Sequence, residues 1–107
     1  MTINLPDDLK HFIAEHGLFE GFTSNDSPGY VEIWAIEGIP RENKAVAMDV
    51  YAPGFLAFAG NGSGEVLAFD AVGAVYVIPL IGMDAEQAIK IAESFAEFAE
   101  TFELDAE

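Results

Sequence analysis

The chain has 107 residues, of which 51% are hydrophobic, and this content excludes a disordered chain in spite of a formal net charge of −15. Nineteen acidic residues against four basic ones exclude a nucleic-acid-binding protein and a protein of anionic membrane surfaces, because both ligands require a cationic surface. The lack of cysteine excludes disulfides, thiolate metal sites and a cysteine nucleophile, and the length predicts one domain over residues 1–107.

The first predicted element is a helix over residues 6–16. Pro6 is favoured at the first helical position, and the two aspartates that follow it suit the positive end of the helix dipole. Gly17 is suited to end the helix. An apolar stripe of helical spacing runs along it, formed by Leu9, Phe12, Ile13 and His16.

The N-terminal residues MTINLPDDLK lack the basic and apolar regions of a signal peptide. No apolar run in the chain approaches the ~18–20 residues of a membrane span. We therefore expect a cytoplasmic protein.

The next segments are predicted to alternate between loops and strands. Residues 18–29 are expected to be irregular, with a polar surface loop at 23–29. Residues 30–36 (YVEIWAI) are rich in β-branched and aromatic side chains and predict the first strand. A second loop is expected over 38–44 and a second strand over 45–51.

Residues 54–80 predict a meander of three short strands at 55–59, 65–69 and 74–78. The turns between them are indicated by the cluster Asn-Gly-Ser-Gly at 61–64 and the weaker cluster Asp-Ala-Val-Gly at 70–73. Both faces of these strands carry apolar side chains. We therefore expect the meander to be buried on both sides or covered by helices.

The last predicted element is a helix over about residues 85–102, with Asp84 as N-cap and Gln87 three residues later. Its apolar stripe is Ala88, Ile91, Ala92, Phe95, Phe98, Ala99 and Phe102. The whole pattern predicts an α+β fold, in which an antiparallel or mixed sheet of about five strands spans residues 30–81. An N-terminal helix and a longer C-terminal helix are expected to pack on this sheet.

No motif for catalysis, metal binding or cofactor binding stands out in the sequence. His11 and His16 have no partner at a meaningful spacing, and no glycine-rich loop joins a strand to a helix. Three carboxylates, Asp49, Glu65 and Asp70, could converge as an acid/base pair or a hard-cation site, although so acidic a chain produces such coincidences by chance. Trp34 is read as a residue of the core or its margin rather than as a ligand platform. We expect no enzyme, no metal and no cofactor.

The expected C-terminal helix carries an unusual concentration of negative charge. Glu93, Glu97, Glu100 and Glu103 would lie in its later turns, where carboxylates oppose the helix dipole, and the first two would repel each other at i, i+4. This predicts a surface that binds a basic protein, made of Glu93, Glu97 and Glu100 with Glu32 and Glu37 near the edge of the sheet. The alternative is that the acidity serves solubility or adaptation to salt.

Four parts of the chain resemble the SUKH superfamily, which contains a fungal cell-wall-assembly regulator and many bacterial immunity proteins. The first is LPDDL followed by a helix bearing Phe12, and the second is VEIWAI at 31–36. The third and most typical is the central run FLAFAGNGSGEVLAFD at 55–70, followed by Gly73 and a strand. SFAEF at 94–98 is similar to the last helix of the family.

This resemblance implies a non-enzymatic α+β domain that binds other proteins. For a bacterial member it implies an immunity protein that neutralises a polymorphic toxin, often a nuclease. An acidic surface suits that role, because nuclease sites are basic and attract an acidic inhibitor. The alternative is a stand-alone housekeeping scaffold or regulatory module whose partner is unknown.

Overall fold

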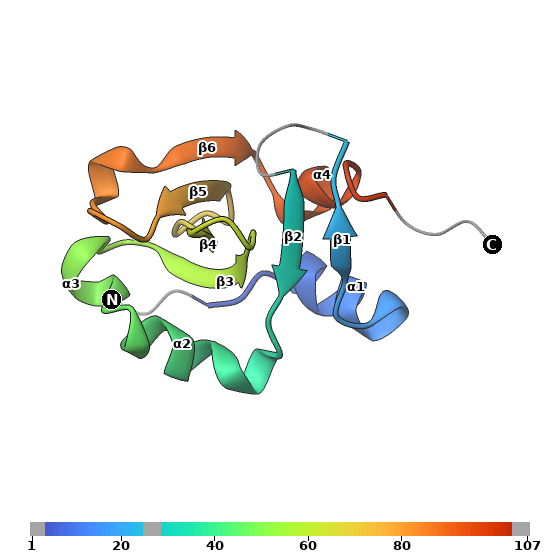
Figure 1. Cartoon of the computed structure of the whole chain (residues 1–107). Helices are drawn as coiled ribbons and strands as arrows, with labels where there is room; N and C mark the ends of the chain where they lie inside the picture. The colour runs from blue at the N-terminus through green and yellow to red at the C-terminus, as the bar shows by residue number, and fades with distance from the viewer. Residues whose placement is uncertain (1–3, 25–28, 104–107) are drawn as a thin grey trace.

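The computed structural model describes residues 4–24 and 29–103 and contains a six-stranded antiparallel sheet in the order β1-β2-β3-β4-β5-β6. The sheet curls, with helices at both ends (Figure 1). The strands are β1 (Glu20–Phe22), β2 (Tyr30–Ile33), β3 (Leu56–Gly60), β4 (Glu65–Phe69), β5 (Val75–Pro79) and β6 (Ile89–Ala92). The helices are α1 (Asp7–His16), α2 (Ile39–Ala45), α3 (Met48–Tyr51) and α4 (Phe95–Ala99), with short 3-10 turns η1 (Ile36–Gly38) and η2 (Ala85–Gln87). The α+β class is confirmed, and the sheet has six strands where about five were predicted.

The central meander is confirmed, and its strands are buried on both faces as predicted. β3, β4 and β5 follow one another through the two turns that the glycine clusters indicated. One face belongs to a large apolar cluster that contains the stacked rings of Phe58 and Phe69, 4.1 Å apart. The opposite face belongs to a second, smaller cluster beneath α3, which contains Met48 and Ala52. The sheet is therefore the middle layer between two apolar clusters.

The large cluster joins the two ends of the chain. Leu9 of α1 is fully buried, and Phe95 of α4 contacts the rings of Phe58 and Phe69. Phe12 of α1 packs edge-on against Phe95 at 5.4 Å. The buried stripe of α1 ends before His16. The prediction that His16 extends this stripe is wrong, because its side chain is exposed.

Residues 38–51 contain the helices α2 and α3, so the predicted loop over 38–44 and the predicted strand over 45–51 are both wrong. α2 begins with Pro40 in its first turn, and α3 buries Met48, with Ala52 one turn further. The spacing of these two residues is helical, and burial beneath the sheet overrides the β propensity of the neighbouring valines and tyrosine. Asn43 fixes α2 to the sheet, because its side chain bonds both the N–H and the C=O of Ala57 at 2.8 Å.

The predicted long C-terminal helix is also wrong. Asp84 caps a short 3-10 turn, with its carboxylate accepting the Glu86 N–H at 2.8 Å, and the chain then extends as β6. β6 pairs with β5, whose open edge offers backbone hydrogen bonds that a helix at this position would leave unmade. A helix begins only after Ser94 and lasts to Ala99, although Phe95 and Phe98 are buried as expected.

The sheet extends further than the predicted span of 30–81. Residues 18–24 contain β1, which pairs with β2 and begins the sheet at residue 20. β2 is shorter than the predicted 30–36, because Trp34 makes its last ladder bond to Phe58 and the chain then turns into η1. The segment after α4 returns to β1, where Glu103 donates its N–H to the Phe22 carbonyl at 2.9 Å. Residues 25–28 of the predicted polar loop lie outside the described residues.

Candidate protein-binding surface

One part of the sheet has side chains on its outer face that no described element covers. The smaller apolar cluster lies on the face of β3–β5 that meets α3, and this face continues across Gly60 onto β2 and β1. On these two strands the face carries Glu20 and Phe22 of β1 and Tyr30 and Glu32 of β2. We call the surface formed by these four residues the β1–β2 face. Three of these residues are exposed and Tyr30 is half-buried, with 64% of Phe22 accessible to solvent.

The register of the two strands places these four side chains in two close pairs. Glu20 lies opposite Glu32, and Phe22 lies opposite Tyr30. The ladder bonds run instead through the alternate residues, from Thr23 to Gly29 and from Ile33 to Phe19. Glu20–Glu32 and Phe22–Tyr30 are therefore non-hydrogen-bonded pairs, in which opposed side chains approach each other most closely.

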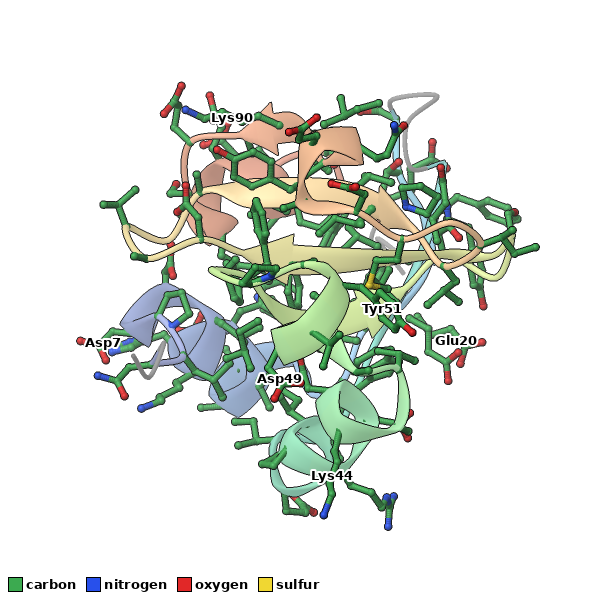
Figure 2. All side chains as sticks on the ribbon, turned by 90° about the vertical axis from the view of Figure 1, so that its left-hand side faces the viewer. Asp7, Glu20, Lys44, Asp49, Tyr51 and Lys90 are labelled. Atoms are coloured by element: carbon green, nitrogen blue, oxygen red, sulfur yellow. The ribbon has the colours of Figure 1, made fainter. Side chains whose placement is uncertain are left out.

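Neither Glu20 nor Glu32 is in an ion pair with another described residue. Within residues 4–24 and 29–103, Lys90 pairs with Glu93, and the His16 imidazole lies 3.9 Å from the Glu15 carboxylate. Lys44 and Lys90 lie well away from Glu20 in Figure 2. The Tyr30 hydroxyl donates a hydrogen bond to Glu20, and this bond with the nearby carboxylates raises the pKa of Tyr30 to about 12. Tyr30 thus orients one of the two carboxylates.

The aromatic pair lies directly beside these charges. The rings of Phe22 and Tyr30 meet edge to face with centroids 5.4 Å apart. Gly60, opposite Glu32, adds no side chain to the face, and a Cβ at Gly62 would lie 3.6 Å from the Tyr30 ring. An accessible ring next to two unpaired carboxylates can bind a cation that also has an apolar or planar surface.

The five predicted binding residues do not form one cluster. Glu32 lies on the β1–β2 face, and Glu37 is exposed on η1. Glu93 follows β6 and pairs with Lys90 at 2.8 Å. Glu97 lies in the first turn of α4, and Glu100 is the C-cap residue of that helix.

Glu93 and Glu97 do not lie in the later turns of one long helix, contrary to the prediction. Glu97 is near the N-terminus of α4, where the dipole favours a carboxylate, and its Oε1 accepts the Glu93 N–H at 2.6 Å. The two residues are not stacked at i, i+4 on a long helix. Their negative charges are therefore locally compensated, in contrast to those of Glu20 and Glu32.

Sequence reasoning missed Glu20, Phe22 and Tyr30. The alternation Glu-Gly-Phe at 20–22 and Tyr-Val-Glu at 30–32, on either side of a polar loop, is a hairpin pattern that could have indicated them. Its first arm is three residues long and contains a glycine, so the strand signal is weak. Trp34 is half-buried and packs against both apolar clusters, as the prediction of a core-margin residue stated.

The carboxylates that could have formed a chemical centre have structural partners. Glu65 accepts a hydrogen bond from buried Asn61 at 2.6 Å, and Asp70 accepts the N–H groups of Val72 and Ala74 in its turn. Asp49 is exposed on α3. No group of three or more potential metal ligands gathers among the described residues.

A second surface feature is an apolar hollow of about 540 Å³ beside α3. Its lining carries no charge and comprises Val46, Tyr51, Leu80, Gly82 and Met83. Tyr51 and Asp49 are on the helix that faces the viewer in Figure 2. The hollow and the β1–β2 face thus differ in chemistry, one being apolar and the other aromatic and acidic.

Among the described residues, none of the helices has the length and apolar character needed to span a membrane.

Comparison with known proteins identifies the family of the chain. No curated protein matches the sequence. The family described as SMI1 / KNR4 (SUKH-1) matches residues 1–101, nearly the whole chain. With this match and the α+β fold, the chain belongs to the SMI1 / KNR4 family (SUKH-1).

Proposed function

We propose that this protein is a non-enzymatic binding domain that acts in the cytoplasm as an immunity protein and neutralises a basic, nuclease-type toxin. The observation that carries the proposal is the β1–β2 face, where two carboxylates that form no ion pair with the described residues lie beside an exposed ring. Membership of the SMI1 / KNR4 family supports the coarser statement that the domain binds a protein.

The charge of the chain suits a basic partner. A net charge of −15 on 107 residues produces a negative field around the whole domain. A nuclease binds phosphates and therefore presents a cationic site, which such a field attracts from a distance. The same field repels nucleic acid and anionic membranes, so it also favours a protein as the ligand.

The acidic residues outside the β1–β2 face belong to the proposal as its periphery. Glu37, Glu93, Glu97 and Glu100 are exposed and add negative charge around η1 and α4. Charges at the rim of an interface change the association rate more than the lifetime of the complex. We propose Glu32 as the member of the predicted set that contacts the partner directly.

The alternative function is a housekeeping scaffold or regulatory module with another partner. The uncharged hollow beside α3 favours it, because an apolar lining suits a neutral surface of a partner. Binding there would depend little on salt, whereas binding of a basic toxin would weaken strongly as salt rises. The salt dependence therefore separates the two functions.

The test first asks whether the gene of this protein adjoins a gene for a basic, nuclease-type toxin, and the absence of such a gene would contradict the proposal. The activity of that toxin is then measured at increasing ratios of the two purified proteins. Inhibition complete at a one-to-one ratio, with an association rate that falls at least about tenfold from low to high salt, is the expected result. A toxin that stays fully active in the presence of excess protein would contradict the proposal. Binding that is independent of salt would favour the scaffold function.

A further inference from the structure

The β1–β2 face is an uncovered continuation of a sheet face that is covered elsewhere. Over β3–β5 the same face is buried beneath α3, where Met48 and Ala52 are almost inaccessible. Beyond Gly60 no described element covers this face, and Glu32, Glu20 and Phe22 are exposed there. A surface of this kind fits an external partner, whose chemistry must match the side chains on it.

Two opposed carboxylates define the charge of that partner. Like charges directly across a strand pair destabilise a sheet, and the close pairing of Glu20 with Glu32 imposes this cost. No described ion pair relieves it. A cation placed between the two carboxylates would remove the repulsion and form two charge-assisted hydrogen bonds. The hydrogen bond from the Tyr30 hydroxyl fixes the position of the Glu20 carboxylate that would bind such a ligand.

The aromatic pair defines the shape of the cation. Phe22 is two residues from Glu20 on the same side of β1, so the two side chains leave the strand at positions about 7 Å apart. The Tyr30 ring supports the Phe22 ring from one side, while 64% of Phe22 stays open to solvent. A planar guanidinium can bond a carboxylate through its edge and stack on a ring through its face, whereas an ammonium is a compact, strongly hydrated charge.

We propose that the β1–β2 face receives an arginine side chain of the partner protein, bonded by Glu20 and Glu32 and stacked on Phe22. This rests on the proposed function and deepens it by naming the contact surface and the side chain that it recognises. The arginine would neutralise the repulsion between the two opposed carboxylates. A basic toxin would then be bound here at close range, and the remaining acidic residues would attract it from a distance.

The first experiment uses two matched peptides, acetyl-Gly-Arg-Gly-Arg-Gly-amide and its lysine counterpart, titrated into the isotopically labelled protein. Saturable amide shifts confined to residues around 19–23 and 29–33, with the arginine peptide binding about threefold to fivefold more tightly, are expected. The double variant Glu20→Gln/Glu32→Gln should bind the arginine peptide at least about tenfold more weakly. Phe22→Leu should remove the preference for arginine over lysine.

The control is Glu15→Gln/Glu86→Gln, which makes the same change in charge at exposed positions on α1 and η2. Equal weakening by the control and by the β1–β2 variant would show attraction to charge alone and would overturn the proposal. So would equal binding of the two peptides, or shifts spread over the whole surface. Thermal unfolding of each variant would identify any loss of peptide binding that comes from unfolding.

A second experiment separates this inference from the proposed function. If the triple variant Glu20→Gln/Glu32→Gln/Phe22→Leu still inhibits the toxin fully, the assigned surface is wrong and the immunity function stands. If the unmodified protein does not inhibit the toxin but binds the arginine peptide at this face, the immunity function is wrong and the arginine site stands. If the triple variant loses both peptide binding and inhibition while the unmodified protein keeps both, the result supports the arginine site and the immunity function together.

Discussion

The carboxylate of Asp8 on α1 accepts a hydrogen bond from the backbone N–H of Ala96 at 2.9 Å, so the first helix caps the last. The N–H groups in the first turn of a helix have no partner within it. In α4 they are bonded by Asp8 and by the Ser94 hydroxyl, which accepts the Glu97 N–H at 3.1 Å. The contact joins residues that are 88 positions apart and fixes α4 against the large apolar cluster.

Replacing Asp8 should therefore weaken the attachment of α4. We expect Asp8→Ala to lower the free energy of unfolding by about 1 kcal/mol, the usual cost of a lost cap. Urea unfolding followed by circular dichroism measures the change. Asp7→Ala is the matched control, because Asp7 is an exposed neighbour in the same turn. Equal effects of the two variants would mean that charge near the start of α1, rather than the bond to Ala96, matters.

Replacing Glu97 should change the free energy of unfolding in opposite directions in the expected long helix and in the observed α4. A carboxylate in the later turns of a helix would be unfavourable, and its removal would stabilise the protein. In the structure Glu97 accepts the Glu93 N–H and lies in the first turn, so Glu97→Ala should lower the free energy of unfolding by about 0.5–1 kcal/mol. Chemical unfolding at low salt measures the sign. A more stable variant would contradict the observed role.

Ala47 has a backbone conformation that glycine adopts more easily. It lies between α2 and α3 with φ of 56° and ψ of 47°, the left-handed region. Ala47→Gly should raise the free energy of unfolding by about 0.5 kcal/mol, because relief of strain outweighs the greater entropy of glycine in the unfolded chain. Ala45→Gly is the control and should lower it by about 0.5–1 kcal/mol, since Ala45 is helical. A loss of stability in both variants would refute the strain argument.

Phe95 and Phe22 test the division between core and surface. Phe95 is 1% exposed among five other aromatic rings, and Phe95→Ala should cost about 3–5 kcal/mol of unfolding free energy. Phe22→Ala should change it by less than about 0.5 kcal/mol, because the ring is mainly in water. Thermal and urea unfolding of the two variants compare them directly. Similar losses would show that Phe22 has a structural role.

The pKa of Tyr30 should be observable in an alkaline titration. Its bond to Glu20 raises the pKa to about 12, so the Tyr30 phenol keeps its proton where an ordinary tyrosine has lost it. The neutral phenol is favoured in the folded state, so its contribution to stability is fully present below about pH 10 and is lost as pH rises through about 12.

The measurement is the ultraviolet difference titration between the protein and its Tyr30→Phe variant, which isolates one of three tyrosines. Glu20→Gln should move the isolated transition back towards pH 10, because the carboxylate that holds the proton is gone. A transition near pH 10 in the unmodified protein would show that the bond does not persist in solution.

The sequence by itself determined the parts of the fold that rest on local signals. The residues from 6 to 17 carry a start signal, an apolar stripe and a glycine stop, and α1 follows them closely. The strands β3, β4 and β5 follow from apolar runs between turns rich in glycine and asparagine. The charge excess and the absence of cysteine are fixed by composition.

Only the tertiary structure decided how residues 38–51 and 85–102 fold and where the acidic residues gather. A helical period at 85–102 is overridden because β5 has an open edge that β6 fills, and Ser94 then starts a separate helix. Glu20 and Glu32 are twelve positions apart and become a pair only through the register of β1 on β2. Register depends on contacts between segments distant in sequence, and no local propensity encodes it.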